Sequence, residues 1–172
     1  CPEERLFFRD TRYIGMREKN GERVFWGRGN GWVTAGLTVI IDNMPDDYPA
    51  KARYVALFRE MMERIAGLQG ADGFWHASLL DPASYPAPET SATGFFTYSL
   101  LWGVNRGLLD RAHYGPVAEK GWRALCEAVH EDGKVGYGQP IGADPQQVGR
   151  DDTEVYGVGA LLMAGRQMYD YV

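Results

Sequence analysis

The sequence has little of what marks several common functional classes. Only two of its 172 residues are cysteine, Cys1 and Cys126, and neither belongs to a CxxC pair, so neither a disulfide framework nor a cysteine metal site is expected. The histidines and acidic residues also lack metal-ligand spacing, and we expect no metal and no cofactor. No apolar run reaches the roughly 18–20 residues that a membrane span needs, so no membrane partner is expected.

Basic residues are in the minority. The chain has 18 Lys and Arg against 23 Asp and Glu, which gives a net charge of -5. No basic cluster of the kind that binds nucleic acid is visible, so no nucleic-acid partner is expected. The acidic balance mainly favours solubility. It does not exclude an anionic ligand, because a pocket needs only one well-placed cation.

Apolar and aromatic residues are plentiful. Hydrophobic residues make up 45% of the chain and aromatic residues 13%, with 5 Trp and 10 Tyr. The chain can therefore bury a core, and we expect Cys126, which lies in an amphipathic stretch, to be part of it. Aromatic rings with a polar tip also suit sugars, which are themselves partly apolar and partly polar.

The hydrophobic pattern predicts an all-α protein with five helices, at about residues 29–43, 50–69, 90–106, 115–131 and 153–169. The second and fourth are amphipathic, with apolar residues on one face and ion pairs on the other. The first, third and fifth carry uncharged stretches rich in Gly, Ala, Ser and Thr. A helix that is apolar all round is expected to be covered on all sides.

The alternation of uncharged and amphipathic helices is a repeat. The uncharged helices begin near residues 29, 90 and 153, roughly 60 residues apart, with one helical hairpin per unit. Such units form either an open solenoid or a closed α/α toroid, and uncharged inner helices favour the toroid. A six-hairpin toroid of this period needs roughly 300 residues or more. Residues 1–172 are therefore expected to form about half of the ring, and the opening "CPEERLFF" fits a piece of a longer protein.

The long loops predict where a site would lie. The segments 70–89 and 132–152 each connect an amphipathic helix to the next uncharged one, and each contains an Asp-Gly turn followed by an expected short strand. Loops of this length are usually functional. Both enter uncharged helices at their N-terminal ends, which share one mouth in a toroid. Free N–H groups and the helix dipole favour anions there.

The stretch "FWGRGNGW", residues 25–32, supplies four candidate binding residues at this mouth. Arg28 offers a fork of donors suited to a carboxylate, although it could instead tie the loop to a helix C-terminus or to an acid. Trp26 and Trp32 can stack on a sugar or simply pack in the inner layer. Asn30 can bind a ligand or cap the first helix. The residues therefore predict a pocket for a carboxylate-bearing, aromatic-stacked ligand such as a uronic sugar.

Two further candidates lie in and after the first long loop. Glu89 stands directly before the helix expected at residues 90–106, either as a site residue or as a first-turn helix charge that favours the dipole. His76 follows an aromatic residue, and it can line the site or serve a structural purpose.

An acidic cluster precedes the fifth expected helix. Adjacent carboxylates can raise one another's pKa and so form an acid/base pair. Alternatively, Asp152 or Thr153 caps the helix while the other acids are solvated, which is the interpretation we favour. The cluster consists of Asp151, Asp152 and Glu154.

Four segments carry a family resemblance. "FWGRGNGW", "ADGFWHASL", "PETSATGFFTYSLLWGVNRG" and "DDTEVYGVGALLMAG" resemble the unsaturated rhamnogalacturonyl hydrolases of glycoside hydrolase family 105. More distantly, they are similar to the unsaturated glucuronyl hydrolases of family 88. The resemblance covers essentially the whole chain and implies a six-hairpin α/α toroid. It also implies a hydrolase that acts on oligosaccharides left by polysaccharide lyases, by hydrating the vinyl ether of their terminal 4,5-unsaturated uronic acid.

The resemblance also implies roles for particular residues. Arg28 would contact the uronate carboxylate, and Trp26, Trp32 and Asn30 would shape the sugar subsite. The catalytic aspartate of the family lies upstream of the position equivalent to Cys1, so the chain is expected to be the C-terminal half and inactive alone. Arg9 stands near the point where the family often has histidine, which leaves the sugar next to the uronate open.

Two other expectations concern function and assembly. The main alternative to the hydrolase is a non-catalytic carbohydrate-binding module of helical repeats, which would keep the binding residues without an aspartate. A homodimer formed through the cut surface of the half-ring is also considered. The sequence leaves the compartment open between cytoplasm and periplasm.

Overall fold

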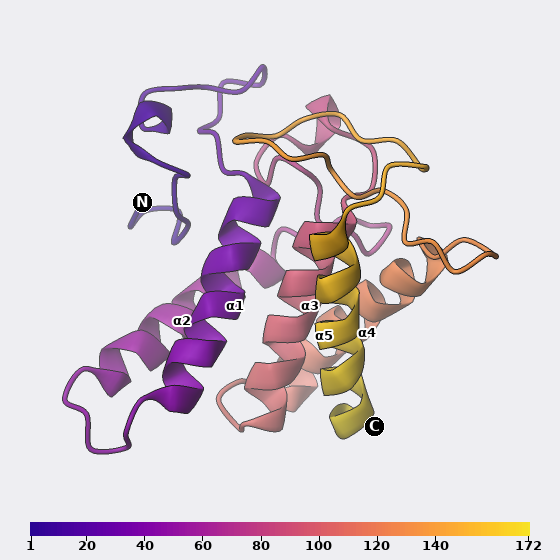
Figure 1. The fold of residues 1–172 in the computed structure, drawn as a ribbon. Helices are drawn as coiled ribbons and strands as arrows, with labels where there is room; N and C mark the ends of the chain where they lie inside the picture. Colours follow the sequence, from indigo (N-terminus) through magenta and orange to yellow (C-terminus); the bar gives the residue numbers. More distant parts are fainter.

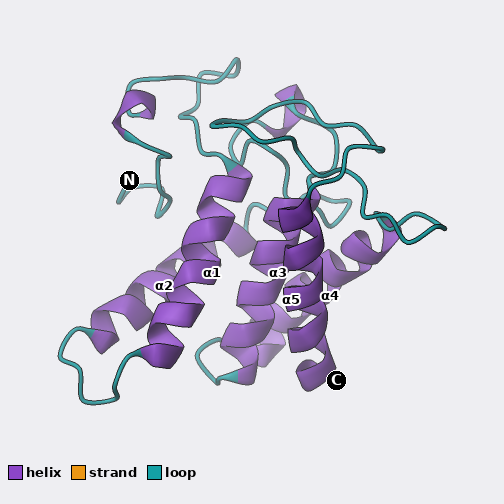
Figure 2. Cartoon of the chain, viewed as in Figure 1, coloured by secondary structure: helices purple, strands orange, loops and turns teal.

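The computed structural model describes residues 1–172 and contains helices and loops but no sheet (Figure 2). Two short 3-10 helices lie in the loops, at Thr11–Tyr13 and Pro82–Ser84. The five predicted helices are all present, so the all-α prediction is confirmed. They are α1 (Gly27–Asn43), α2 (Lys51–Ala66), α3 (Thr90–Asn105), α4 (Arg111–Glu127) and α5 (Val155–Tyr171).

The helices form two layers. The inner layer consists of α1, α3 and α5, whose N-terminal ends all point toward the long loops, while α2 and α4 lie behind it (Figure 1). Helix α3 packs against α1, α4 and α5 and is buried along most of its length. Small residues permit this close packing, because a Cβ added at Gly94 of α3 would lie 2.7 Å from the Cβ of Ala160 in α5. The predicted inner and outer helices are therefore confirmed.

The core lies between the two layers. Phe58 of α2 meets Trp102 of α3 edge-on, with ring centroids 5.2 Å apart. Trp75, from the loop after α2, inserts its indole into the same core and donates to the carbonyl of Ile65 at 2.7 Å. This loop is therefore fixed to the helices by a buried anchor.

The two outer members of the inner layer each expose an apolar face. Helix α1 exposes Trp32 and Ile40, and α5 exposes Leu162 and Tyr169, the last with 79% of its surface free. The prediction that every uncharged helix is covered on all sides is therefore correct for α3 and wrong for α1 and α5. The reason is position, because α3 has an inner neighbour on each side whereas α1 and α5 have only one.

Three local predictions are wrong. Helix α4 begins four residues early, at Arg111, because the Asp110 side chain accepts from the backbone N–H groups of Ala112 and His113 and so caps the helix there. The long loops contain no strands, only isolated bridges such as the one between Trp26 and Ser78. Cys126 is exposed rather than buried, because it lies on the outer side of α4.

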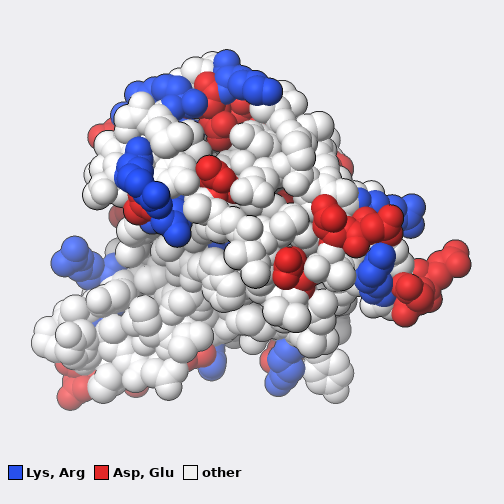
Figure 3. Space-filling view, turned by 45° about the horizontal axis from the view of Figure 1, so that its top comes forward, with Lys and Arg blue, Asp and Glu red and all other residues white.

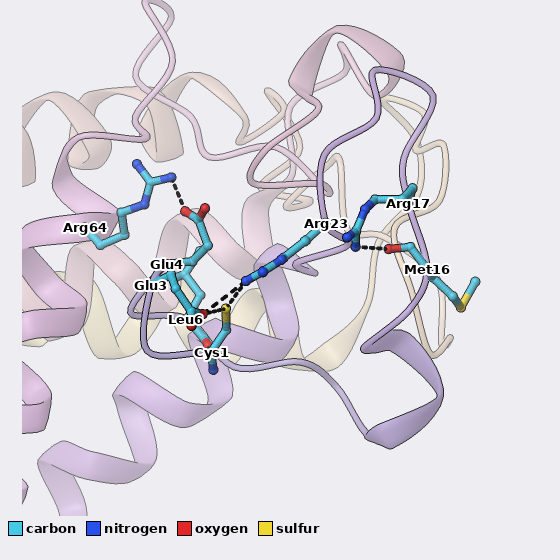
Figure 4. A network of polar contacts seen from close by, with 8 residues as sticks. All are labelled: Cys1, Glu3, Glu4, Leu6, Met16, Arg17, Arg23 and Arg64. Atoms are coloured by element: carbon cyan, nitrogen blue, oxygen red, sulfur yellow. Dashed lines mark hydrogen bonds and ion pairs between the residues drawn. The ribbon is translucent and has the colours of Figure 1, made fainter.

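The segment before α1 is fastened to α2 and to itself (Figure 4). Arg64 of α2 donates to the Glu4 carboxylate at 2.6 Å, and Arg23 donates to Glu3 at 3.1 Å and to the Cys1 sulfur at 2.6 Å. This N-terminal segment therefore lies against the helices rather than apart from them. None of the helices has the length and apolar character needed to cross a bilayer.

Candidate functional site

The predicted mouth exists in the structure. The N-terminal ends of α1, α3 and α5 lie together beneath the long loops (Figure 1). Viewed from the loop side, charges of both signs are scattered over this face, with no continuous basic patch (Figure 3). Residues from three other segments meet there around the loop residue Gln139.

Arg28 lies at the centre of this group and is only 2% exposed. Its guanidinium is held between the rings of Trp26 and Tyr156, with its Cζ 4.6 and 4.4 Å from their centroids. Through Nη1 it donates to the carbonyl of Gln139 and to the Tyr156 hydroxyl, and through Nη2 to the carbonyl of Pro140 at 2.9 Å. Arg28 therefore ties α1 to the loop between α4 and α5 through loop carbonyls and to α5 through Tyr156, and not to the helix C-terminus or acid that the alternative interpretation expected.

Arg28 nevertheless retains capacity for a ligand. A guanidinium has five N–H donors, and the protein takes two from Nη1 and one from Nη2. The Nε–H and the second Nη2–H have no partner in the protein. No carboxylate lies within ion-pair distance of Arg28. A buried cation without a counterion is costly, so an anion is the natural ligand for this position.

The two tryptophans occupy different environments. Trp26 is buried, its indole Nε1 donates to the Gln139 side chain at 3.0 Å, and its ring contacts Arg28. It shapes the site by holding Arg28 and has no face open to a sugar. Trp32 is 51% exposed on α1, with its ring centroid 4.4 Å from that of Phe95. Trp32 therefore offers the open aromatic surface that stacking requires.

Asn30 is buried and fully used within the protein. Its Oδ1 accepts from the backbone N–H of Phe7 at 2.9 Å, and its Nδ2 donates to the carbonyls of Phe7 and Trp26, both at 3.1 Å. It does not cap α1, because Trp26 holds the cap position and makes no side-chain cap bond. Asn30 instead fixes the N-terminal segment to α1.

Glu89 is the N-cap of α3 and is completely buried. Its carboxylate accepts from the backbone N–H groups of Ser91 at 3.1 Å, Ala92 at 2.7 Å and Gln139 at 3.3 Å, and from the Ser91 hydroxyl at 2.7 Å. Both carboxylate oxygens therefore have partners within the protein, and the residue has no exposed surface for a ligand. Of the two interpretations of Glu89, the structure favours the helix-terminal one, with the additional finding that it joins α3 to the loop of Gln139.

His76 does not join this group. Its Nδ1 lies 3.0 Å from the carbonyl of Ala87, and its Nε2 lies 3.6 Å from the Asp72 carboxylate. Both partners belong to the first long loop, so the side chain braces that loop. None of its hydrogen bonds reaches Arg28 or Gln139.

The acidic cluster before α5 does not form an acid/base pair. Asp151 accepts from Lys134 at 3.0 Å, and this hydrogen bond lowers its pKa below the ordinary value. Asp152 accepts from the backbone N–H of Gly149 at 2.7 Å. The expectation that Asp152 or Thr153 caps α5 is also wrong, because Glu154 holds that position and makes no side-chain cap bond.

Sequence reasoning missed Gln139 and Tyr156. Tyr156 lies within "DDTEVYG", and the motif alone did not distinguish it from a packing residue; burial raises the pKa of its hydroxyl. Gln139 carries no sequence signal, because its importance depends on which segments meet around it. The main cavities lie elsewhere, and the largest, about 520 Å³, lies between the N-terminal segment, the end of α2 and residues 79–82.

Known proteins resemble the whole chain. Residues 1–172 match the family model described as Glycosyl Hydrolase Family 88. An unsaturated 3S-rhamnoglycuronyl hydrolase from Formosa agariphila is 47% identical over 172 residues, which cover 96% of this chain and 46% of that protein. A solved family 88 glycosyl hydrolase from Bacteroides vulgatus is 38% identical with a TM-score of 0.96, covering 100% of this chain and 51% of that one.

A possible member of family 105 from Salmonella enterica shares the fold, with a TM-score of 0.74 at 24% identity and coverage of 91% of this chain and 44% of that one. The predicted α/α toroid is thereby confirmed, and the family model confirms the predicted relationship to family 88. The chain spans about half the length of the relatives it matches. It belongs to glycosyl hydrolase family 88.

Proposed function

We propose that these residues form the carboxylate-binding wall of a hydrolase that releases a 4,5-unsaturated uronic acid from the non-reducing end of lyase-generated oligosaccharides. The observation that carries the proposal is Arg28, a buried guanidinium with two free N–H donors and no acidic partner. A uronate carboxylate would accept from both donors and neutralise the charge. Trp32, exposed on the same helix, would stack on the sugar ring.

In this proposal the residues around Arg28 bind the substrate, and another part of the protein transfers the proton. In the proposed reaction a proton adds to C4 of the vinyl ether and the oxygen of a water adds to C5. The resulting hemiketal opens and the terminal sugar leaves. Arg28 would hold the carboxylate attached to C5 and so orient the double bond. Burial raises the pKa of Glu18, but Glu18 contacts Ser78 rather than the Arg28 group.

The proton donor is therefore proposed to be an aspartate outside residues 1–172, with the chain as the C-terminal half of a complete ring. The exposed apolar faces of α1 and α5 support this, because they stand where further inner helices of a toroid would pack. A second copy of the chain is the alternative cover for these faces. Light scattering of residues 1–172 separates the two, since a monomer would argue against the homodimer.

For the substrate, we propose a uronate linked to rhamnose. The Formosa agariphila relative is named an unsaturated 3S-rhamnoglycuronyl hydrolase. Arg9, the departure from the family 105 pattern, forms an ion pair with Asp10. Rhamnogalacturonan fragments from pectin have the same kind of linkage and belong in the same assay.

The test is the ultraviolet absorbance of the conjugated alkene. The intact protein should remove this absorbance from lyase-generated oligosaccharides that end in an unsaturated uronate. If the absorbance of every such oligosaccharide stays unchanged in the presence of the protein, the hydrolase proposal is wrong. If calorimetry then still detects binding of the oligosaccharide, the non-catalytic carbohydrate-binding module takes its place.

A further inference from the structure

Gln139 makes a hydrogen bond with every polar group it has. It lies in the loop between α4 and α5 and is 0% exposed. Its backbone N–H donates to Glu89 at 3.3 Å, and its carbonyl accepts from Arg28 and from the Tyr156 hydroxyl. Its side-chain oxygen accepts from the Trp26 indole at 3.0 Å, and its side-chain nitrogen donates to the Asp144 carbonyl. One loop residue thus joins the N-terminal ends of α1, α3 and α5.

The chemistry of these partners requires an amide at this position. An indole Nε1 can only donate and a backbone carbonyl can only accept. The side chain at residue 139 must therefore present one acceptor, toward Trp26, and one donor, toward Asp144. An ionised Glu lacks the donor, and Met, of similar size, lacks the donor and has only a weak sulfur acceptor. The orientation of the Gln139 amide is also fixed. In the reverse orientation its nitrogen would face the Trp26 N–H, donor against donor, and its oxygen would face the Asp144 carbonyl, acceptor against acceptor.

Arg28 is oriented from two sides by this one residue. The Gln139 carbonyl accepts from Nη1, while the Gln139 side chain fixes the Trp26 ring that covers one face of the guanidinium. Together they determine where the free Nε–H and the second Nη2–H of Arg28 point. A fork of two donors recognises a carboxylate only when its direction is held.

We propose that Gln139 is a positioning residue for the carboxylate subsite, acting through Trp26 and Arg28. The inference rests on the proposed function, in which Arg28 binds the uronate. It assigns the recognition of the acid to the loop between α4 and α5 as well as to the "WGRGNGW" segment of α1. The expected signature is a loss of preference for a carboxylate, rather than a uniform weakening of sugar binding.

The experiment compares two probes on the intact protein by calorimetry: an unsaturated uronate–rhamnose disaccharide and its methyl ester. Wild-type protein should prefer the acid by on the order of tenfold or more, the value of a charge-assisted pair of hydrogen bonds. Gln139→Met should reduce this acid-to-ester ratio by at least about threefold. Gln147→Met is the matched control, because its side chain also donates to a loop carbonyl, that of Ser84, on the exposed surface.

A second variant covers the case in which Gln139→Met does not fold. Gln139→Glu is isosteric and keeps the acceptor for Trp26, but its charge beside Arg28 would compete with the ligand carboxylate, so the acid-to-ester ratio should again fall. A ratio equal to that of wild type in either folded variant, even with weaker binding of both probes, would overturn the positioning role. Equal binding of acid and ester by the wild-type protein would instead remove the carboxylate subsite itself, and the inference with it.

Discussion

Two charged groups stand at the same mouth and have opposite characters. The Arg28 group is buried, joins four segments and leaves donors without a partner. Of the acids Asp151, Asp152 and Glu154, the first is exposed and the other two are partly exposed, and the contacts of Asp151 and Asp152 are with Lys134 and with their own turn. Burying a charge without a counterion is costly, whereas a solvated charge costs little. The comparison teaches that the incompletely satisfied buried charge, rather than the denser charge cluster, marks the candidate site.

The largest expected effect comes from removing the buried cation. Arg28→Ala should lower kcat/KM on unsaturated uronate oligosaccharides by on the order of 100-fold, because two charge-assisted hydrogen bonds to the ligand are lost. Steady-state kinetics on the intact protein give the number. Arg123→Ala is the control, since Arg123 forms only an exposed pair with Glu119 at 3.9 Å. Equal kinetics for the two variants would remove Arg28 from the site.

A large effect on stability is expected at Glu89. Glu89→Ala would leave the backbone N–H groups of Ser91, Ala92 and Gln139 without their acceptor. The loss of a buried cap of this kind should cost about 2–4 kcal/mol. Thermal denaturation measures it, with the exposed Glu127→Ala as control. A melting temperature shared by the two variants would mean that Glu89 does not hold the loop to α3.

A moderate effect is expected at the stacking surface. Trp32→Ala should raise KM by roughly tenfold with a smaller change in kcat, because stacking on a sugar contributes about 1–2 kcal/mol of binding. Ile40→Ala tests the same helix further from the mouth, where an exposed apolar side chain has no proposed ligand. If Ile40→Ala has the larger effect on KM, the subsite has been placed at the wrong end of α1.

The smallest effect is expected in the acidic cluster. Asp151→Asn should leave kcat/KM unchanged, because the side chain is exposed and bound to Lys134. Since the folded-state pKa of Asp151 is lowered, its contribution to stability is present above the ordinary carboxyl pKa and is lost as the pH falls through the folded-state value. Urea unfolding of wild type and variant should therefore converge at low pH. A marked loss of activity would restore the acid/base interpretation of the cluster.

The helices and the mouth could be predicted because their signals are local or periodic. Uncharged stretches near residues 29, 90 and 153 reveal the inner layer without any tertiary information. The burial of Arg28 could not be predicted, because it depends on Tyr156 and on a loop more than a hundred residues away in the sequence. The exposure of the α1 and α5 faces was missed for a related reason, because the composition of a helix does not show how many other helices pack against it.

The most direct test of the central claim compares turnover of an unsaturated uronate–rhamnose disaccharide with turnover of its methyl ester by the intact wild-type protein. The ester keeps the double bond and the sugar but replaces the negatively charged carboxylate with a neutral methyl ester. We predict that kcat/KM for the acid exceeds that for the ester by at least about tenfold, since Arg28 supplies the missing counterion. Equal values for acid and ester would contradict the assignment of Arg28 as the uronate-binding residue.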